Sequence, residues 1–452
     1  MKSKGVVWFR KDLRLTDNPA WSRATTDHDE VTALFVVDPA LWDLAGDNRR
    51  NQLVAHLAAL DGDLASCGGR LRVYRGDPVK VLPDLARQVT ADLVHWNTDV
   101  SPYAARRDDA VRNALQNRCV GHPGSWVHPP GSIQTSSDKA YRVFTHFHRA
   151  WDQLDRPLWA TPGEARVLGD HGDGLPPADS DPLMPPGAAG AMHRLAQFLD
   201  RVDRYRSGRH DLDSTSRLSA DLKFGTIDPR RLAAEVGERT AGRRAFLRQL
   251  AWRDFYGHLM AAYPWTARED MRPEVGSIPW RTDPEALEAW KTGTTGYPMV
   301  DAGMRQLLAE GWMPNRVRMM VASFLVKDLL IDWREGERHF LRFLVDGDPA
   351  QNVGNWQWVA GTGADAAPYS RIFNPVTQSR RFDHEGWYIK RWVPELRRLP
   401  PQVVHAPWEA HADVLEAAGV RLGSEYPKPI VDHPEARREA LAAFEAATAG
   451  GA

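Results

Sequence analysis

The chain has 452 residues, of which 42% are hydrophobic and 26% charged, and its formal net charge is -1. This mixture excludes a disordered chain and a collagen-like chain. At about 150 residues per domain, the length predicts two or three domains or one large two-lobed body. Tryptophan is unusually frequent, because its 18 residues outnumber the 14 Phe and the 10 Tyr.

Neither export nor membrane insertion is predicted. The apolar run near the N-terminus is shorter than the about 7–15 apolar residues of a signal peptide, and no run reaches the about 18 apolar residues of a membrane span. Cys67 and Cys119 could pair, but a disulfide framework is not credible in a chain of this size, and their spacing indicates no zinc site. We therefore expect a cytoplasmic protein with no membrane partner.

The charge is unevenly distributed. Residues 201–400 hold 31 Lys and Arg against 26 Asp and Glu, a balance of +5, so the other 252 residues hold 27 against 33, a balance of -6. The basic half is the better candidate for an anionic partner, although random surface variation explains so small a bias equally well.

The first 125 residues alternate short apolar runs, typical of buried strands, with helical patterns. This alternation predicts a parallel sheet with helices on both faces, that is, a Rossmann-like α/β domain. No Gly-x-Gly-x-x-Gly follows a strand, so a dinucleotide bound in the usual Rossmann manner is not supported. We expect strands over 5–9, 31–37, 71–74 and 93–96, and helices over 51–64, 79–89 and 103–117.

A proline-rich stretch separates this region from a helical one. Residues 156–187 hold seven Pro, which predicts a connecting segment that is neither helix nor strand. From about residue 190 the pattern is helical; the apolar residues from Val317 to Leu325, for example, follow helical spacing. We predict an α/β domain over 1–130, a linker over 131–195 and an all-α domain over 196–452.

Three polar motifs in the second half are candidates for ligand binding. The hydroxyl-rich cluster Thr215–Ser219 leads into a helix, and the free N–H groups of a helix start suit phosphate. Asn315–Met319 opens another helix and presents an amide, a guanidinium and a thioether on one face. Taken alone, each also fits an ordinary capped helix.

The third motif, Asp346–Trp358, is the densest. It combines carboxylates and carboxamides with two Trp, and its Gly and Pro predict a loop that is more typical of a ligand site than of a connector. The carboxylates suit a general acid/base pair or a metal site. Because no His or third acidic ligand is adjacent, we do not expect a metal.

Aromatic residues accompany these motifs. Trp252–Tyr256 is an aromatic and basic cluster, and eleven of the 18 Trp lie from Trp252 onward. Aromatic faces beside Arg are what the stacking of nucleobases needs. A single Trp is most often a core residue, but this set lies inside the polar motifs and therefore favours ligand binding.

The motifs and their order resemble the DNA photolyase/cryptochrome family. Residues 7–18, Val-Trp-Phe-Arg-Lys-Asp-Leu-Arg-Leu-Thr-Asp-Asn, are similar to the N-terminal signature of that family. The resemblance covers nearly the whole chain and is greatest to class I cyclobutane pyrimidine dimer photolyases, which are carbon–carbon lyases of DNA repair. The further matching segments are Thr215–Ser219, Trp252–Tyr256, Gly296–Ala302, Gly311–Arg316, Asp346–Trp358 and Tyr369–Pro375.

The resemblance implies a non-covalent FAD in the helical domain, at the bottom of a cavity that admits a base flipped from the duplex. Arg318 and Asp346 would form an ion pair beside the flavin ring, and Asn352 would face its N5 atom. The positions that match FAD-binding residues are Tyr205, Thr215, Ser216, Arg217, Leu218, Ser219, Arg253, Asn315, Arg318, Asp346, Asp348 and Asn352.

The implied reaction is driven by light. Excited reduced FAD donates an electron to a cyclobutane pyrimidine dimer, the ring splits, and the electron returns, so no net redox change occurs. Trp356, Trp333 and Trp280 match the chain that reduces oxidised flavin in light. The positions that match dimer- and DNA-binding residues are Gln249, Trp252, Arg316, Met319, Trp358 and Arg371.

Two positions depart from the family pattern. Gln249 stands where dimer photolyases have a Glu, and Gln at this position also occurs in (6-4) photolyases and animal cryptochromes. The two active-site His of that branch match Asn315 and Met319 here, which argues against it. Pro314 stands where His is common in dimer photolyases.

The resemblance also implies a light-harvesting antenna in the N-terminal domain. The folate-binding subgroup has a Glu near the position of Ala104, whereas Asp99–Tyr103 is more similar to the deazaflavin-binding subgroup. We expect 8-hydroxy-5-deazaflavin, with contacts at Asp38 and Asp99. Methenyltetrahydrofolate, or no antenna, is the alternative.

The leading hypothesis is therefore a cyclobutane pyrimidine dimer photolyase that acts as a monomer on damaged DNA. A (6-4) photolyase, motivated by Gln249, and a cryptochrome-type blue-light receptor without repair activity are the alternatives. The short stretch after the family-matching residues 427–445, and Asn352 in place of the Asp or Cys common in cryptochromes, favour repair over signalling.

Overall fold

The computed structural model describes residues 2–213, 215–275 and 278–449. The chain forms two compact units. Unit 1 consists of residues 1–207, 216–267 and 345–351, and unit 2 of residues 208–215, 268–344 and 352–452. The domain limits predicted at residues 130 and 195 stay a prediction, because these units are defined by compactness alone.

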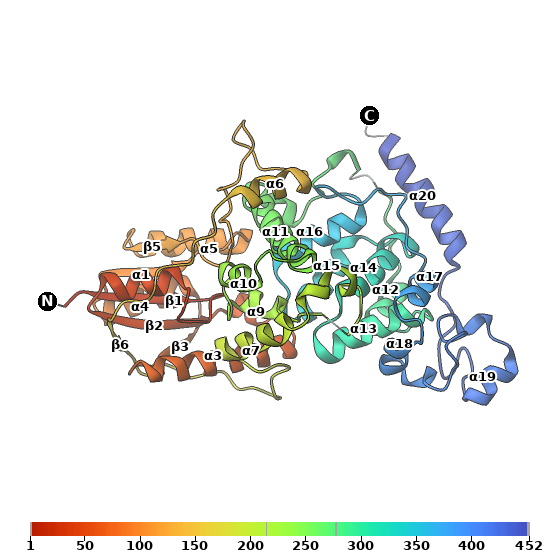
Figure 1. Cartoon of the computed structure of the whole chain (residues 1–452), viewed down its shortest axis with the longest axis horizontal. Helices are drawn as coiled ribbons and strands as arrows, with labels where there is room; N and C mark the ends of the chain where they lie inside the picture. Colours follow the sequence, from red (N-terminus) through yellow and green to blue (C-terminus); the bar gives the residue numbers. More distant parts are fainter. Residues whose placement is uncertain (1, 214, 276–277, 450–452) are drawn as a thin grey trace. The chain divides into compact units, whose positions relative to one another are not determined.

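A parallel sheet forms the N-terminal part of unit 1, at the red end of the colour bar in Figure 1. Its strand order is β3-β2-β1-β4-β5, and β6 also pairs with β2. Every pairing is parallel, as the alternation of strands and helices predicts. The strands are β1 (Lys4–Phe9), β2 (Glu30–Val37), β3 (Leu71–Arg75), β4 (Leu93–Asn97), β5 (Cys119–His122) and β6 (Arg166–Leu168).

Helices cover both faces of this sheet. Those of unit 1 are α1 (Pro19–Asp27), α2 (Pro39–Trp42), α3 (Asp47–Ser66), α4 (Pro78–Gln88), α5 (Pro102–Ala114), α6 (Phe144–Gln153), α7 (Gly187–Leu199), η1 (Val202–Arg204), α9 (Ser219–Phe224), α10 (Pro229–Val236), α11 (Ala241–Ala262) and η2 (Pro264–Ala267). Alternate residues of β1 enter two apolar cores. Val7 and Phe9 join α1 and α3, whereas Val6 and Trp8 join α4 and α5. The predicted α/β class is confirmed.

Local sequence explains where several of these helices begin. Asn18, Asp77 and Ser101 each precede a Pro, and each side chain accepts a hydrogen bond from a backbone N–H of the first turn. A capping side chain followed by Pro is a strong start signal, because Pro has no N–H to leave unpaired. α1, α4 and α5 therefore start at fixed points beside the sheet.

Three buried histidines form a hydrogen-bonded chain beside the sheet. His28 follows α1, His95 lies in β4 and His122 in β5. Nε2 of His28 is 3.0 Å from Nε2 of His95, and Nδ1 of His95 is 3.0 Å from Nε2 of His122. Burial and the neighbouring rings lower the pKa of His95 to about 3, so that ring is neutral at pH 7.

The regular structure of unit 2 is helical throughout its described residues, as predicted. The apolar residues from Val317 to Leu325 are buried and belong to a helix that continues into a π-helical turn, η4. The elements are η3 (Pro273–Val275), α12 (Pro284–Thr292), α13 (Pro298–Glu310), α14 (Asn315–Ser323), η4 (Phe324–Asp328), α15 (Trp333–Phe343), α17 (Pro375–Phe382), α18 (Trp387–Trp392), η5 (Pro394–Leu396), η6 (Pro407–Glu409), α19 (Ala412–Ala418) and α20 (His433–Ala449). Two helices run from one unit into the other, α8 (Tyr205–Gly208) and α16 (Pro349–Ala360).

The proline-rich stretch is more ordered than predicted. The expectation that residues 156–187 hold neither helix nor strand is wrong, because β6 lies within them and pairs with Glu30–Thr32 of β2. Val167 of β6 is buried in the core beside β2. A strand of three residues is too short to give an alternating pattern, so prolines dominate the sequence signal.

The prediction of a loop over Asp346–Trp358 is also wrong. Most of it is α16, which begins at Pro349. The Asp348 carboxylate accepts hydrogen bonds from the N–H groups of Ala350 (3.1 Å) and Gln351 (3.3 Å). Asp followed by Pro is a signal for a helix start, but the same pair is also typical of a turn.

The structure also bears on the two cysteines and on the apolar length of the helices. Cys67 and Cys119 are both free thiols, so the possible pairing does not occur. Within residues 2–213, 215–275 and 278–449, no helix combines the length and the apolar character needed to cross a membrane.

Candidate functional site

The N-terminal signature anchors the C-terminal end of α9 within unit 1. Arg14 is buried and donates to the carbonyl of Gly225 (2.8 Å) and to the carboxylate of Asp228 (3.0 Å). Gly225 has a φ of +68°, and a Cβ at this position would collide with the backbone of Lys11, so glycine is required. The signature therefore fixes the end of α9, the helix that begins at Ser219.

The backbone of Ser216–Ser219 has a shape that suits an anion. Arg217 is left-handed, with a φ of 53°, and Leu218 is right-handed, with a φ of -78° and a ψ of -2°. Successive residues of opposite hand direct their N–H groups toward one point, which makes an anion-binding concavity. The hydroxyl groups of Ser216 and Ser219 add further donors.

A charged cluster of unit 1 joins the signature to α16. Nζ of Lys11 is 2.8 Å from Asp99 and 3.2 Å from Asp348. Although burial opposes the change, these two carboxylates raise the pKa of Lys11. Burial lowers the pKa of Arg49 to about 10, against the attraction of Asp346 and Asp348. Lys11 thus forms ion pairs with both Asp99, which is predicted to contact the antenna, and Asp348, which is predicted to contact the flavin.

Arg253 is bonded to backbone groups of unit 1. Its guanidinium donates to the carbonyls of Ser125 (2.5 Å) and Leu222 (3.4 Å) and lies 4.8 Å from the ring centre of Trp126. The side chain of Gln351 donates to the Arg253 carbonyl at 2.9 Å. Two residues of matching segments, Arg253 and Gln351, are therefore in direct contact.

Trp252 is held by other aromatic rings of unit 1. The ring of Phe144 stacks on it at a centroid distance of 3.7 Å and an interplanar angle of 9°. Tyr256 lies against it at 5.5 Å. Trp252 is half-buried, and Gln249, also half-buried, stands about one turn earlier on α11. Two of the residues predicted to hold the lesion thus lie on one helix.

The predicted antenna residue Asp38 has partners within the protein. It caps α2 and accepts a hydrogen bond from the Tyr103 hydroxyl at 2.5 Å. A guanidinium nitrogen of Arg107 is 3.9 Å away. Burial and the Asp38 carboxylate raise the pKa of Tyr103, which keeps the phenol protonated as the donor.

The start of α14 in unit 2 presents the predicted amide, guanidinium and thioether. Nδ2 of Asn315 donates to the Met319 sulfur at 3.6 Å, so these residues share a face as predicted. Nη2 of Arg316 lies 3.0 Å from Nδ1 of His210, and its guanidinium lies 4.5 Å from the ring centre of Phe382.

Arg318, on the same helix, donates to the carbonyl of Met313 at 2.9 Å. Its expected partner Asp346 belongs to unit 1. The ion pair between Arg318 and Asp346 stays a prediction, as does the role of Tyr205, whose ring packs on Phe246 at 5.3 Å.

Asn352 is held by a residue that no sequence motif indicated. Its Nδ2 donates to the carbonyl oxygen (2.9 Å) and to Oε1 (2.8 Å) of Glu337 in α15. Burial raises the pKa of Glu337, and the bond from Asn352 opposes that shift. With its N–H groups directed to Glu337, the amide presents Oδ1 as the acceptor for a ligand N–H.

The three Trp predicted to carry electrons lie in unit 2. Trp356 is buried and packs edge-on against Phe340 at 5.0 Å. Trp333 is fully buried, and its Nε1 donates to the Asp270 carboxylate at 2.8 Å. Trp280 is partly exposed. Electron transfer along these residues stays a prediction.

The remaining predicted DNA-binding pair also lies in unit 2. Arg371 is exposed, and its guanidinium lies 5.7 Å from the ring centre of Trp358.

In the described part of the chain, no group of three or more His, Cys, Asp or Glu side chains is arranged to hold a metal ion.

Comparisons with known proteins place these residues in a family. The family model described as DNA photolyase matches residues 5–163, and the model described as FAD binding domain of DNA photolyase matches residues 246–446. A deoxyribodipyrimidine photo-lyase of Escherichia coli is 41% identical, over 98% of this chain and 99% of that protein. The chain belongs to the DNA photolyase family. A second deoxyribodipyrimidine photo-lyase, from Agrobacterium fabrum, is 40% identical over 98% of this chain and 97% of its own length.

Solved structures of the DNA photolyase family have the same architecture. A class III photolyase from Agrobacterium tumefaciens is 39% identical, with a TM-score of 0.92 over 99% of this chain and 98% of that chain. A Synechocystis cryptochrome is 29% identical, with a TM-score of 0.90 over 97% of this chain and 99% of that chain. An archaeal photolyase from Sulfolobus tokodaii, solved with two FAD molecules, is 32% identical, with a TM-score of 0.85 over 98% of this chain and 100% of that chain.

The match to the FAD-binding domain supports FAD as the cofactor of this photolyase family member. The residues present fit such a group. The backbone turn at Arg217 and Leu218 suits a pyrophosphate. Burial and the cations Arg49 and Lys11 lower the pKa of Lys223 well below its usual value. An anion bound beside Lys223 would therefore stabilise its charged form. The amide of Asn352 is oriented to accept from a ring N–H.

Three residues that contact the predicted site residues are not indicated by any sequence motif. Glu337, Phe144 and Asp270 each contact a predicted residue, namely Asn352, Trp252 and Trp333. None lies in a polar or aromatic motif beside its partner, so only the folded chain brings the pairs together.

Proposed function

We propose that this protein repairs cyclobutane pyrimidine dimers in DNA with the energy of light. Relatives named deoxyribodipyrimidine photo-lyase that are 40–42% identical over 96–98% of the chain give the most direct support. The partner is damaged DNA with the dimer flipped out of the duplex, and the enzyme acts as a cytoplasmic monomer. Its class I affiliation is part of the proposal.

FAD is held by residues of the matching segments. The hydroxyl and N–H groups of Thr215–Ser219 bind its pyrophosphate, and Asn352 accepts from the ring while Glu337 keeps the amide in that orientation. When bound and reduced, FAD supplies an electron to the dimer after light absorption. The further FAD-binding residues are Tyr205, Arg253, Asn315, Arg318, Asp346 and Asp348.

The dimer is bound by aromatic walls and one amide. Trp252, kept rigid by the ring of Phe144, stacks on the dimer. Met319 and Trp358 supply further apolar surface, and Arg316 and Arg371 bind the DNA backbone. Gln249 hydrogen-bonds pyrimidine carbonyl and N–H groups. Because it is an amide, it cannot act as a carboxylate.

Trp356, Trp333 and Trp280 form the path by which electrons reach oxidised flavin. Their order of exposure, from two buried rings to the partly exposed Trp280, supports this direction. The Asp270 carboxylate at the indole N–H of Trp333 favours a positive charge on that ring.

The antenna site is proposed in the N-terminal α/β part, with 8-hydroxy-5-deazaflavin as chromophore and Asp38 and Asp99 as contacts. Both carboxylates already bind protein groups, so they would use their remaining lone pairs. The Sulfolobus tokodaii structure was solved with two FAD molecules, with the implication of a novel light-harvesting cofactor. Methenyltetrahydrofolate or no antenna is the alternative. Co-expression with a deazaflavin pathway should add an absorption band beyond those of flavin. If no such band appears, deazaflavin is excluded as the antenna chromophore.

One experiment tests the main proposal. The purified protein, with FAD reduced, is illuminated with DNA that contains either a cyclobutane dimer or a (6-4) photoproduct. Repair of the cyclobutane dimer alone is expected. Repair of the (6-4) lesion alone would favour the function suggested by Gln249. Repair of neither would favour the cryptochrome-type blue-light receptor.

A further inference from the structure

His210 is a half-buried histidine of unit 2 whose imidazole lies between two arginines. Nη2 of Arg316 on α14 is 3.0 Å from Nδ1 of the ring, and Nε of Arg209 is 3.3 Å from its Nε2. The ring packs against Phe382 of α17 at a centroid distance of 5.7 Å and an interplanar angle of 63°. These contacts join the segment that holds Arg209 and His210 to two helices of the same unit.

The hydrogen bonds of this imidazole are incomplete. A guanidinium can only donate, so the short contact makes Nδ1 of His210 the acceptor for Arg316, and the proton of the neutral ring is then on Nε2. Among the described residues, only guanidinium nitrogens approach Nε2, at 3.3 Å, and they cannot accept its proton. Nε of Arg316 is also buried and has no hydrogen-bond partner in the described chain. Two N–H donors at this place therefore lack an acceptor.

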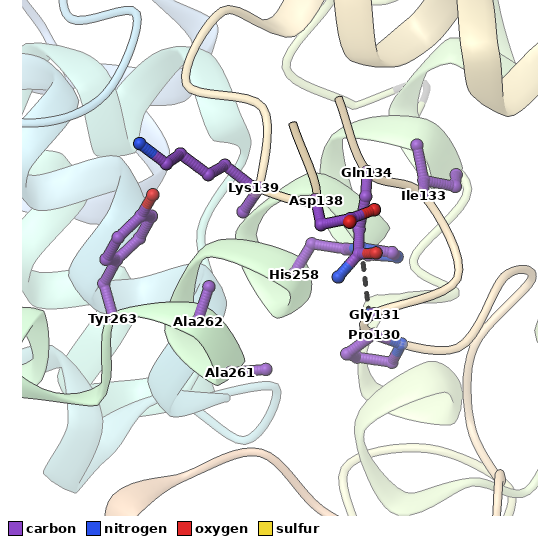
Figure 2. A pocket seen from close by; sticks show the side chains of 11 residues that line it. Pro130, Gly131, Ile133, Gln134, Asp138, Lys139, His258, Ala261, Ala262 and Tyr263 are labelled. Carbon is purple, nitrogen blue, oxygen red and sulfur yellow. Dashed lines mark hydrogen bonds between the residues drawn. The ribbon is translucent and has the colours of Figure 1, made fainter. Parts of the chain in front are cut away.

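A second histidine, His258, has both ring nitrogens satisfied by the protein. It lines a pocket at the C-terminal end of α11, where Figure 2 marks its hydrogen bond to Gly131 by a dashed line. Its Nδ1 accepts from the N–H of Gly131 at 3.3 Å, and its Nε2 donates to the carbonyl oxygen of His128 at 3.2 Å. His258 thus has no N–H to offer, whereas His210 keeps one for a ligand.

Four arginines lie close together around His210, and we call them the arginine cluster: Arg209, Arg316, Arg371 and Arg381. The guanidinium groups of Arg316 and Arg381 lie 4.5 Å and 5.2 Å from the ring centre of Phe382. Burial and the repulsion of the other three arginines lower the pKa of Arg316. In the described part of the chain, no member of the cluster forms an ion pair with a carboxylate. The cluster therefore keeps a positive charge that the protein does not neutralise.

The acidic residues next to these segments are engaged elsewhere. Asp211 accepts a hydrogen bond from the N–H of Asp213 at 3.2 Å. Asp383, which follows α17, accepts from the N–H of Tyr388 at 3.0 Å, and burial together with the charge of Asp213 raises its pKa. These carboxylates therefore supply no acceptor for Nε2 of His210.

We propose that His210 positions Arg316 for the phosphate backbone of damaged DNA, and that its Nε2–H binds the same phosphate. An imidazole suits this task because it fixes a guanidinium without cancelling its charge, whereas a carboxylate would take the place of the phosphate. Backbone phosphate fits the observations because it offers acceptor oxygens and a negative charge to a set of donors. The inference rests on the function proposed above, since it takes damaged DNA as the ligand.

Binding of a phosphate beside His210 should take up a proton. In the free protein, burial and the charges of Arg316, Arg209 and Arg381 lower the pKa of His210 to about 4. A negative phosphate in contact with the ring raises that pKa by about 1–3. Between the two pKa values the complex binds a proton that the free protein does not bind, so DNA affinity rises as pH falls into this window. If the pKa rises by about 2, the affinity at pH 5 is about tenfold that at pH 8.

Equilibrium binding of a short duplex with one cyclobutane dimer, at constant salt, tests both roles of His210. At pH 8, His210→Ala should weaken binding about 2–10-fold, because Arg316 loses its acceptor. His210→Asn places an amide oxygen near the position of Nδ1 and should recover part of this loss. Between pH 8 and pH 5, the wild type should gain about tenfold more affinity than either variant. Its slope of log affinity against log salt should also become steeper, by up to about 0.9.

Two controls isolate the effect. His411→Asn changes an exposed histidine of unit 2 whose side chain forms no capping hydrogen bond, and it should retain the wild-type pH profile. In an Arg316→Gln background, His210→Ala should weaken binding at pH 8 less than it does in the wild type, because the residue that His210 positions is absent. An equal effect in both backgrounds would overturn the positioning role.

The outcomes separate this inference from the proposed function. Equal gains in affinity from pH 8 to pH 5 for the wild type and His210→Asn would overturn proton uptake at His210. Wild-type affinity of His210→Ala at pH 8, in a protein that repairs the dimer, would overturn the positioning role and leave the proposed function intact. A wild-type protein that neither binds nor repairs lesion DNA would refute both.

Discussion

The buried histidine chain predicts how the stability of the protein depends on pH. His95 is hydrogen-bonded to both other rings, and its pKa is lowered to about 3. In the unfolded chain a histidine takes up a proton near its ordinary pKa of about 6.5. As pH falls from 6.5 toward 3, the unfolded chain binds a proton at this histidine, whereas the folded chain does not. The contribution of His95 to stability is therefore lost in this pH window and is fully present above it.

The magnitude follows from the size of this shift. One proton difference changes the free energy of unfolding by about 1.4 kcal/mol per pH unit. Because the unfolded histidine is only half protonated at pH 6.5, His95 alone should cost about 2.3 kcal/mol between pH 6.5 and pH 4.5. The variant His95→Gln cannot titrate but retains a donor and an acceptor for the neighbouring rings. Its loss of stability over the same range should be smaller by that amount.

Urea unfolding followed by Trp fluorescence, at several pH values and constant ionic strength, measures this difference. Other buried histidines also weaken the protein in acid, so only the gap between the wild type and the variant reports on His95. His146→Gln, at an exposed position in α6, is the matched control and should behave as the wild type. An equal loss of stability for wild type and His95→Gln between pH 6.5 and 4.5 would refute the reasoning.

Three further variants test the proposed sites. Glu337→Ala removes one of the two hydrogen bonds that orient the Asn352 amide, worth about 0.5–1.5 kcal/mol, and should speed reoxidation of reduced FAD in air at least several-fold; an unchanged rate would mean that the Glu337 side chain does not position Asn352. Phe144→Leu removes the ring stacked on Trp252, worth about 0.5–1.5 kcal/mol, and should weaken binding of dimer-containing DNA by roughly 2–10-fold with little effect on undamaged DNA. Trp333→Phe should block reduction of oxidised FAD by light, measured by flavin absorbance, but not repair by chemically reduced enzyme; normal photoreduction would exclude Trp333 from the path.

The α/β part of the fold could be predicted because its strands are buried on both faces. Such strands appear as short apolar runs, and β1 to β4 were found within a residue or two of their limits. β5 was missed because Cys119–His122 contains a Gly and a His and is partly exposed. The sequence predicts a loop in place of α16 because polar side chains mask the helical pattern, and because the capping Asp348 is also typical of a turn.

The candidate site could be predicted only as a set of residue types. The pattern placed Asn315 and Met319 on one face because helical geometry fixes residues four apart. No local rule relates Asn352 to Glu337, which is 15 residues earlier on another helix. Such pairs depend on packing between helices, and periodicity carries no information about which helices meet.

The short strand β6 has a consequence for how the sheet is completed during synthesis. β3 and β6 lie along the same edge of β2, where β3 pairs with Ala33–Val37 and β6 with Glu30–Thr32. Until Leu168 has left the ribosome, the first part of this edge has no partner and exposes free N–H and C=O groups. A fragment that stops at residue 130 would keep that open edge permanently, and we expect it to self-associate more strongly than the full chain.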